Sequence, residues 1–361
     1  MDKRNTSKEL IWKFGVYVFG MLGICALIVF LVDPFFHYHK PWFGLQAVQT
    51  TYQYQTKGAI NHLNYDSVLV GSSVIMSIDT TILDEKYCCR TIKAVGNSAS
   101  TPLLLDYLEC SFENREINNI FYGLDVFAFY NDPDMQIYNS EVAYINNNNP
   151  FDDIQYLLNG TVIGEKVPDM IIASITGNYA SNLAYSFNQN SPTGPEVVFD
   201  HYYSQMQEGE FDEKPYNEDD VLKNIMNLEI MVNEHSSTKF IFFLPAYSVL
   251  WWDRAYEQGR YDTYINTLEV CMERLLKYDN VEMYAVNFND SDTIMDLDKY
   301  IDITHGGVEI TEMMAEQIGN EQQKITLSNY MEQINKLKKI MTQFRKRVNE
   351  EGIDFLCEAG N

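Results

Sequence analysis

The sequence predicts an α/β domain built on a parallel sheet and preceded by one membrane-spanning helix. Two observations favour this fold class. Short apolar runs that end in small or polar residues alternate with segments of helical spacing, which is typical of buried parallel strands covered by helices. An uncharged apolar run, Phe14 to Val32, precedes all of them. The 361-residue chain is 46% hydrophobic and 21% charged, so it has the composition to bury a large core.

The apolar run from Phe14 to Val32 is about long enough to cross ~30 Å of hydrocarbon as a helix. Basic residues precede the run and Asp33 follows it, so the positive-inside rule places the N-terminus in the cytoplasm and the main domain outside. A cleaved signal peptide would have a shorter apolar core and a small-x-small cleavage site, so retention is favoured. The predicted organisation begins with a cytoplasmic tail (1–13), a transmembrane helix (14–32) and a membrane-proximal connector (33–62).

The connector contains His37 and His39, a weak metal-binding pattern because no carboxylate or cysteine accompanies it nearby. Its aromatic residues predict instead a belt at the membrane surface. The members of this belt are Phe35, Phe36, Tyr38 and Trp42.

The α/β domain is expected from residue 63 to 322. Apolar runs predict parallel strands at about 67–71, 118–123, 239–244 and 281–286, and helical spacing is found before and after the third strand. Residues 130–215 interrupt this rhythm with many Asn, Asp, Tyr and Gly residues. We interpret them as an insertion over the sheet, either a lid or family decoration.

Residues 323–361 are predicted to form an amphipathic C-terminal helix and a tail. Apolar residues recur every three or four positions from Leu327 to Val348, and lysines and arginines fill the other faces. A helix packed on the domain is the favoured interpretation. The alternative is a helix that rests on anionic lipid or on an acidic partner.

The formal net charge of −25 repels nucleic acid, so no nucleic-acid partner is expected. Such a surface favours neutral or cationic ligands or other proteins. The six cysteines show no C-x-x-C and no paired spacing, so they predict neither a zinc ribbon, nor a thioredoxin site, nor a disulfide framework.

Two motifs point to chemistry at one edge of the predicted sheet. The first strand ends in Gly71-Ser72-Ser73, which can present a hydroxyl at the carboxyl edge where sites in parallel sheets lie. Late in the chain, Asp302 precedes His305 by three residues, so its carboxylate can hold the imidazole's tautomer and offset its charge. Each motif alone also fits an ordinary turn or helix cap.

Together, the early serine and the late Asp-x-x-His resemble the SGNH (GDSL-like) hydrolase superfamily, a flavodoxin-like three-layer α/β/α sandwich. Ser73 matches the nucleophile of the Gly-Asp-Ser block, in which Ser72 replaces the aspartate, and Asp302 and His305 match the last block. The layout is similar to a membrane-anchored subgroup. That subgroup includes the teichoic-acid D-alanine transfer protein and the alginate O-acetylation proteins.

The resemblance also assigns an oxyanion hole. Gly96 is the candidate for the glycine amide of the second block, and Asp125 stands where the third block has asparagine. An ionised carboxylate accepts hydrogen bonds and cannot stabilise an oxyanion, so this departure favours altered activity or another role for Asp125. After the third strand, Tyr247 and Trp251 are candidates for stacking on a sugar, or else they pack the loop.

The sequence therefore predicts an extracytoplasmic serine esterase or O-acyltransferase that acts on a cell-surface glycan or acylated polymer, with no metal or cofactor. A membrane-bound acyltransferase is a further candidate partner, beside the lipid bilayer itself. The alternative is a non-catalytic SGNH-like module that binds a glycan or such an acyltransferase. Convergence of Ser73, His305 and Asp302 within hydrogen-bond distance would discriminate between them.

Overall fold

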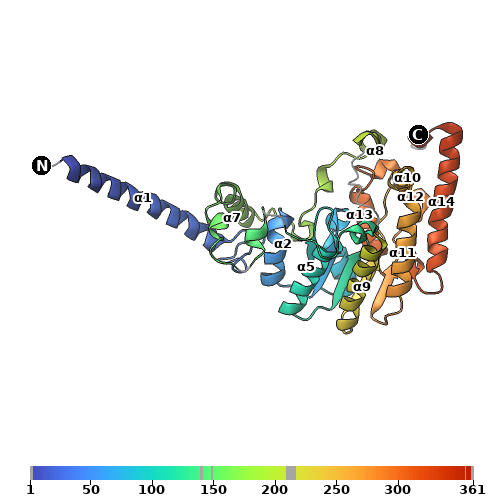
Figure 1. Cartoon of the computed structure of the whole chain (residues 1–361), viewed down its shortest axis with the longest axis horizontal. Coiled ribbons are helices and arrows are strands. Elements are labelled where there is room, and N and C mark those ends of the chain that lie inside the picture. Colours follow the sequence, from blue (N-terminus) through green and yellow to red (C-terminus); the bar gives the residue numbers. More distant parts are fainter. Residues whose placement is uncertain (1–2, 139–140, 148, 209–216, 354, 359–361) are drawn as a thin grey trace. The chain divides into compact units, whose positions relative to one another are not determined.

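The computed structural model describes residues 3–138, 141–147, 149–208, 217–353 and 355–358 (Figure 1). The chain divides into two compact units. The first comprises Met1–Leu63 and Tyr138–Ser181, and the second comprises Asn64–Ile137 and Asn182–Asn361.

The second unit is built on a six-stranded sheet with the strand order β2-β1-β3-β4-β5-β6. Strands β1 to β5 pair in parallel, and β6 adds to the edge in the antiparallel direction. The strands are β1 (Ser67–Gly71), β2 (Thr91–Val95), β3 (Asn119–Gly123), β4 (Lys239–Phe243), β5 (Val281–Tyr284) and β6 (Lys324–Ile325).

The four predicted parallel strands are confirmed, with bounds within two residues of those expected. Each belongs to an apolar run, and every residue of β1 and β3 is buried. Strand β2 was not predicted, because Lys93 interrupts its apolar pattern. With a charged residue at the centre of five, the segment lacks the apolar run by which the other strands were recognised.

Lys93 is nevertheless buried in the sheet. Its Nζ donates hydrogen bonds to the carbonyl oxygens of Met76 and Ala184, both at 2.8 Å. Burial lowers the pKa of Lys93 to about 7, against the opposing effect of the Asp79 carboxylate. A neutral amine has two N–H donors, which match the two carbonyls. Lys93 thereby ties the segment around Ala184 to the end of the helix that begins at Ser73.

Helices flank the strands of this unit, as expected for an α/β fold. The C-terminal helix buries Ile334, Leu337, Met341 and Phe344 and contacts two neighbouring helices, so the interpretation as a packed amphipathic helix is supported. The α-helices of the unit are α3 (Ser73–Met76), α4 (Thr80–Tyr87), α5 (Thr101–Asn114), α8 (Pro195–Glu208), α9 (Glu218–Glu234), α10 (Val249–Glu257), α11 (Tyr261–Leu275), α12 (Ser291–Ile294), α13 (Val308–Gln317), α14 (Tyr330–Glu351) and α15 (Phe355–Glu358).

The first unit contains the N-terminal helix α1 (Lys3–Val32), whose segment Ser7–Val32 is long and apolar enough to span a membrane or to be a signal sequence. The unit also contains α2 (Tyr52–His62), the 3-10 helix η2 (Ala143–Ile145), α6 (Ile154–Leu157), the π-helical turn η3 (Val162–Lys166) and α7 (Val167–Thr176). The segment around α6, η3 and α7 packs against the C-terminal end of α1.

Asp33 organises this unit. Its buried carboxylate accepts hydrogen bonds from the backbone N–H groups of His37, Tyr38 and His39 at 2.7–3.0 Å, and from the Tyr156 hydroxyl at 2.8 Å. Burial raises the pKa of Tyr156, and the Asp33 charge raises it further, so the phenol remains a donor. The residue that follows the apolar helix therefore links the connector to a segment more than 120 positions later.

The connector side chains differ from the aromatic belt that the sequence predicted. Phe35 and Phe36 are buried in the unit rather than exposed in an aromatic belt. Both ring nitrogens of His39 contact main-chain oxygens, those of Lys40 at 2.7 Å and Phe30 at 2.8 Å, so neither is directed at a metal.

The units also differ from the predicted organisation. The connector 33–62 and the insertion 130–215 were expected to be separate additions to the sheet domain. Instead, Tyr138–Ser181 joins the connector and α1 in the first unit, while Asn182 onward belongs with the sheet. Residues 209–215 of the insertion lie outside the described residues. Sequence periodicity could not reveal this division, because it depends on contacts such as Asp33 with Tyr156.

The buried lysine generates a stability prediction. The folded pKa of about 7 lies below the ordinary 10.5, so between these values the unfolded chain binds a proton that the folded chain has lost. The free energy of unfolding should therefore rise with pH across this window. In Lys93→Met this contribution is absent, and two buried carbonyls lose a donor at a cost of about 1–3 kcal/mol each.

Urea unfolding of the full chain in detergent, measured across that pH window, tests this. The difference between wild type and Lys93→Met should grow as the pH rises. Lys346→Met, at an exposed lysine on α14, is the control and should leave the slope unchanged. A pH-independent difference for Lys93→Met would contradict the prediction.

Candidate active site

Ser73 is placed by the close approach of helix α3 to the ends of two strands. A Cβ atom at Gly71 would lie 2.8 Å from Ile75 Cγ1, and one at Gly123 would lie 2.7 Å from Ile75 Cγ2. Both distances are shorter than real carbon contacts, so glycine at both positions allows Ile75 to sit against β1 and β3. Ser72 caps the helix, because its Oγ accepts a hydrogen bond from Val74 N at 3.3 Å.

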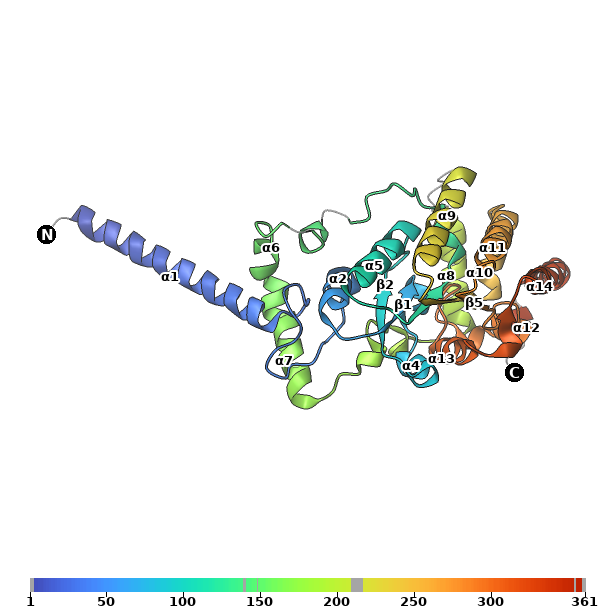
Figure 2. The ribbon, with the colours of Figure 1, turned by 90° about the horizontal axis from the view of Figure 1, so that it is seen from below.

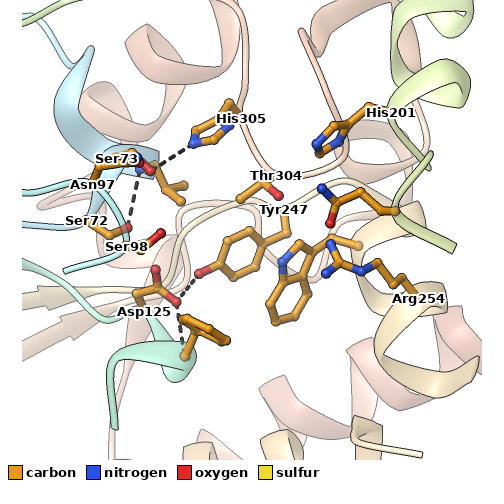
Figure 3. Close-up of a pocket in the computed structure, with 14 residues that line it drawn as sticks. Ser72, Ser73, Asn97, Ser98, Asp125, His201, Tyr247, Arg254, Thr304 and His305 are labelled. Atoms are coloured by element: carbon orange, nitrogen blue, oxygen red, sulfur yellow. Dashed lines mark hydrogen bonds between the residues drawn. The ribbon is translucent and has the colours of Figure 1, made fainter. Parts of the chain in front are cut away.

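Ser73 points in a different direction and meets His305. The Ser73 Oγ lies 2.9 Å from His305 Nε2, and His305 Nδ1 lies 2.7 Å from Asp302 Oδ2 (Figure 3 shows the first of these contacts). Residues separated by 232 positions are therefore joined at the carboxyl edge of the sheet. The three side chains that the sequence predicted to form one site are thus brought together.

The Asp302 carboxylate is held in its ionised form. Burial by itself would raise the pKa of Asp302, but hydrogen bonds and the charge of His305, with the backbone N–H groups of Thr304 and His305, lower it overall. An ionised Asp302 accepts a hydrogen bond from the Nδ1–H group of His305. The Nε2 atom then carries the lone pair that faces the Ser73 hydroxyl.

The His305 imidazole is also contacted by a segment that the sequence placed in the insertion 130–215 and that belongs to the second unit. The Phe187 ring lies edge-on to His305, with centroids 5.3 Å apart. Phe187 N donates to Ser77 Oγ at 3.2 Å, and the neighbouring Asn188 donates to Thr311 at 3.0 Å. These contacts and the link from Lys93 to Ala184 hold this segment beside the site.

Ser73 and His305 line a pocket of about 270 Å³ in the second unit (Figure 3). Helices α8 and α10 supply further lining residues, among them His201, Gln205 and Arg254. Arg254 is 5% exposed, and burial lowers its pKa to about 10, so its guanidinium stays charged at neutral pH. Sequence reasoning missed these three residues, because two of them lie in the insertion and none belongs to a motif.

Gly96 does not occupy the role that the resemblance implies. Its N–H donates to the Gly71 carbonyl oxygen at 3.2 Å and so continues the pairing of β2 with β1. The next two residues, Asn97 and Ser98, line the pocket instead, and Ser98 has a φ of +47°. The expectation that the Gly96 amide faces a developing oxyanion is therefore wrong, because that amide is used by the sheet.

Asp125 lines the pocket as a hydrogen-bond acceptor. Its Oδ1 accepts from Phe127 N at 3.0 Å, where it caps the 3-10 helix η1 (Val126–Tyr130), and from the Tyr247 hydroxyl at 2.6 Å. Burial and the Asp125 charge raise the pKa of Tyr247, which keeps its proton. Figure 3 shows the other carboxylate oxygen turned toward Ser98.

Tyr247 and Trp251 pack the loop, as one of the two interpretations of them expected, and they also reach the pocket. Their rings stack at 4.2 Å with an interplanar angle of 11°, and Trp251 also stacks on Tyr264. Both are buried, and both also line the pocket, whereas Trp252 is 1% exposed and packs the loop. The pair forms an aromatic wall that is held rigid by its own packing.

Comparisons with known proteins add little. No family model and no curated protein matches this chain. Among solved structures, one described as "a putative platelet activating factor from Streptococcus pneumonia" is similar over 74% of this chain and 90% of its own, with 12% identity and a TM-score of 0.38. A likeness at this level carries no argument about function.

Proposed function

We propose that this protein is a serine esterase or O-acyltransferase of the SGNH type, with the flavodoxin-like three-layer architecture of that superfamily. The observation that carries the proposal is the hydrogen-bonded series Ser73–His305–Asp302 at the mouth of a pocket. The strand order β2-β1-β3-β4-β5 supports it, since doubly wound sheets of that order bind ligands outside the carboxyl ends of the strands.

In the proposed reaction, Ser73 Oγ attacks the carbonyl carbon of an acyl ester while His305 Nε2 takes its proton. Asp302 orients the imidazole and offsets the charge that develops on it. Collapse of the tetrahedral intermediate breaks the bond to the leaving alcohol, which receives the proton from His305. Water or a sugar hydroxyl then attacks the acyl-Ser73 ester, with His305 again as base, and regenerates the serine.

The oxyanion requires donors near Ser73. We assign this role to the Ser73 amide, at the N-terminus of α3, together with Asn97, in place of the Gly96 amide that the sheet uses. Asp125 cannot donate while ionised. An esterase with one donor fewer should be slower with simple esters and should depend more on binding energy from the rest of its substrate.

The substrate class follows from the pocket walls and from the surface charge. Tyr247 and Trp251 both line the pocket, and we assign contact with the apolar side of a sugar ring to their accessible parts, since Trp251 is already stacked on Tyr247 and Tyr264. A cell-surface glycan or a related acylated polymer is the proposed substrate. The alternative is a non-catalytic module that binds such a glycan or a membrane-bound acyltransferase, and the specific observation that favours it is the acceptor Asp125 in the pocket.

We also propose that α1 is a retained anchor with the N-terminus in the cytoplasm. The basic residues before the apolar run and Asp33 after it support this orientation. Protease added to spheroplasts should digest the main domain and spare a tag at the N-terminus. Protection of the domain until lysis would contradict the orientation.

The catalytic proposal is tested with the full chain, an aryl ester and a fluorophosphonate probe. Ser73→Ala and His305→Ala should each lower kcat/KM by about 10⁴-fold or more, because the proton relay acts as a unit. Asp302→Asn should be strongly impaired because the imidazole loses its ionised partner. Only variants that retain Ser73 and its base should be labelled efficiently.

Ser72→Ala is the matched control, since Ser72 caps α3 and its hydroxyl does not meet His305. It should retain most of the activity and the labelling. If the wild type shows no Ser73-dependent turnover or labelling with any ester tested, the binding-module hypothesis becomes the better one.

Asp125→Asn examines the departure from the family's pattern. The amide oxygen can still accept from Phe127 N and from the Tyr247 hydroxyl, while the new NH₂ group replaces the oxygen turned toward Ser98. An added oxyanion donor should raise kcat for an aryl ester by about ten-fold or more. Unchanged thermal stability with a lower kcat would show that Asp125 serves the site as a carboxylate.

A further inference from the structure

The first unit exposes large apolar side chains near the end of α1. They lie on the turn after the connector's histidines, on α6 and the residues before it, and on the C-terminal half of α7. We refer to them as the apolar set, which consists of Phe43 (81% exposed), Phe151 (88%), Ile154 (52%), Ile172 (58%) and Ile175 (80%).

The fold of the unit does not explain these side chains. Helix α7 buries Val167 and Met170 and packs Ile171 on the core, whereas Ile172 and Ile175 lie outside that contact. Ile172 and Ile175 leave most of their apolar surface in water, so they add little to the stability of the described unit. Grouped exposed apolar residues of this kind mark interaction sites.

Phe43 gives a second, independent observation. It occupies a tight turn in which Leu45 N donates to Trp42 O at 3.0 Å, with φ values of +57° at Phe43 and +77° at Gly44. A bulky residue at positive φ is strained, and such strain is concentrated at functional sites. The turn holds an aromatic ring out into the surroundings at the expense of both backbone conformation and exposed apolar area.

The location of the set identifies its occupant. Helices α6 and α7 and the turn η3 contact α1, and Val29 and Val32 of α1 pack in one cluster with Tyr156 and Val162. Figure 2 shows α7 running across the C-terminal end of α1. If α1 crosses the bilayer, a helix that crosses its end lies near the membrane plane, within the ~5–10 Å over which interfacial segments insert.

We propose that the apolar set inserts into the outer interface of the same bilayer that holds α1, with the C-terminal half of α7 as an interfacial helix. This inference rests on α1 as a membrane anchor and is independent of the proposed hydrolase chemistry. It assigns to Tyr138–Ser181 the role of a membrane-seated base, in place of a lid over the sheet.

The chemistry of the contact is apolar rather than ionic. Glu165 and Asp169 are exposed on η3 and α7 and would be repelled by anionic headgroups. Trp42 stacks on His39 at 3.5 Å and meets Phe30 of α1 edge-on, so it suits the headgroup boundary. A zwitterionic bilayer should therefore suffice, and insertion should be insensitive to salt.

The test uses full-length protein in phosphatidylcholine vesicles, with an environment-sensitive fluorophore attached to Ile175→Cys or Phe43→Cys. The native Cys25, Cys88, Cys89, Cys110 and Cys357 are replaced, while Cys271 is kept because it is wholly buried and burial raises its thiol pKa. Lipids that carry a nitroxide quencher near the headgroup or deep in the acyl chain report the depth of each probe. Glu165→Cys, at an exposed residue of the preceding turn η3, is the control, and Leu22→Cys reports insertion of α1.

The expected result is blue-shifted emission at positions 175 and 43, quenched more strongly by the shallow nitroxide than by the deep one and unchanged by salt. Position 22 should be quenched by the deep nitroxide, and position 165 should show more water-like emission. Unquenched emission at both 175 and 43 would overturn the proposal: water-like emission would show that the set faces solvent, and blue-shifted emission would show that it packs against another copy of the protein. An unquenched probe at position 22 would show that α1 is not in the bilayer, which would also overturn the proposal. Neither outcome bears on the chemistry proposed for Ser73.

Discussion

The contact of Ile75 with Gly71 and Gly123 is the constraint on which the site depends. Helix α3 lies against two strand ends only because neither position carries a Cβ atom. That contact fixes the first turn of α3, and the first turn fixes which serine caps the helix and which faces His305. A methyl group at either glycine would lie too close to the Ile75 side chain, so Ile75 or the helix that carries it would have to shift. The geometry of the candidate site thus depends on the packing beside it.

The charged groups around this centre differ in role because their surroundings differ. Asp302 is held ionised by hydrogen bonds from one imidazole and two backbone amides, which makes it a fixed acceptor for His305. One carboxylate oxygen of Asp125 accepts two hydrogen bonds, from the backbone at the start of η1 and from the buried Tyr247 hydroxyl. Lys93, below the site, binds two carbonyls and has its pKa lowered to about 7 by burial. Aspartates and lysines on the surface of this acidic chain, whose net charge is −25, are exposed to water instead.

The first unit rests on a comparable device. Asp33 ends the apolar helix and collects three backbone amides of the connector and the hydroxyl of Tyr156. These bonds fold the connector back onto α1 and recruit a segment that sequence order places inside the sheet domain. The outcome is a unit with buried Phe35 and Phe36 and with other apolar side chains left exposed. The segment without clear periodicity is explained by its contacts with α1.

The sequence by itself determined the features that depend on neighbouring residues. Four strands could be predicted because apolar residues dominate their runs, although Glu282 interrupts the last of them. Asp302 could be paired with His305 because three residues of separation suffice for contact. Ser73 could be chosen over Ser72 because it matches the nucleophile position of the family that the sequence resembles. Adjacent residues at a strand end also point apart, so both serines cannot face one histidine. Only the tertiary structure decided the rest. Strand β2 can include Lys93 because distant carbonyl oxygens accept its hydrogen bonds. The Gly96 amide is taken up by the carbonyl oxygen of Gly71 on the neighbouring strand. The grouping of Tyr138–Ser181 with α1 depends on the contact of Asp33 with Tyr156. Burial of a polar group is favourable only when a partner satisfies it, and the partner's position is a property of the folded chain.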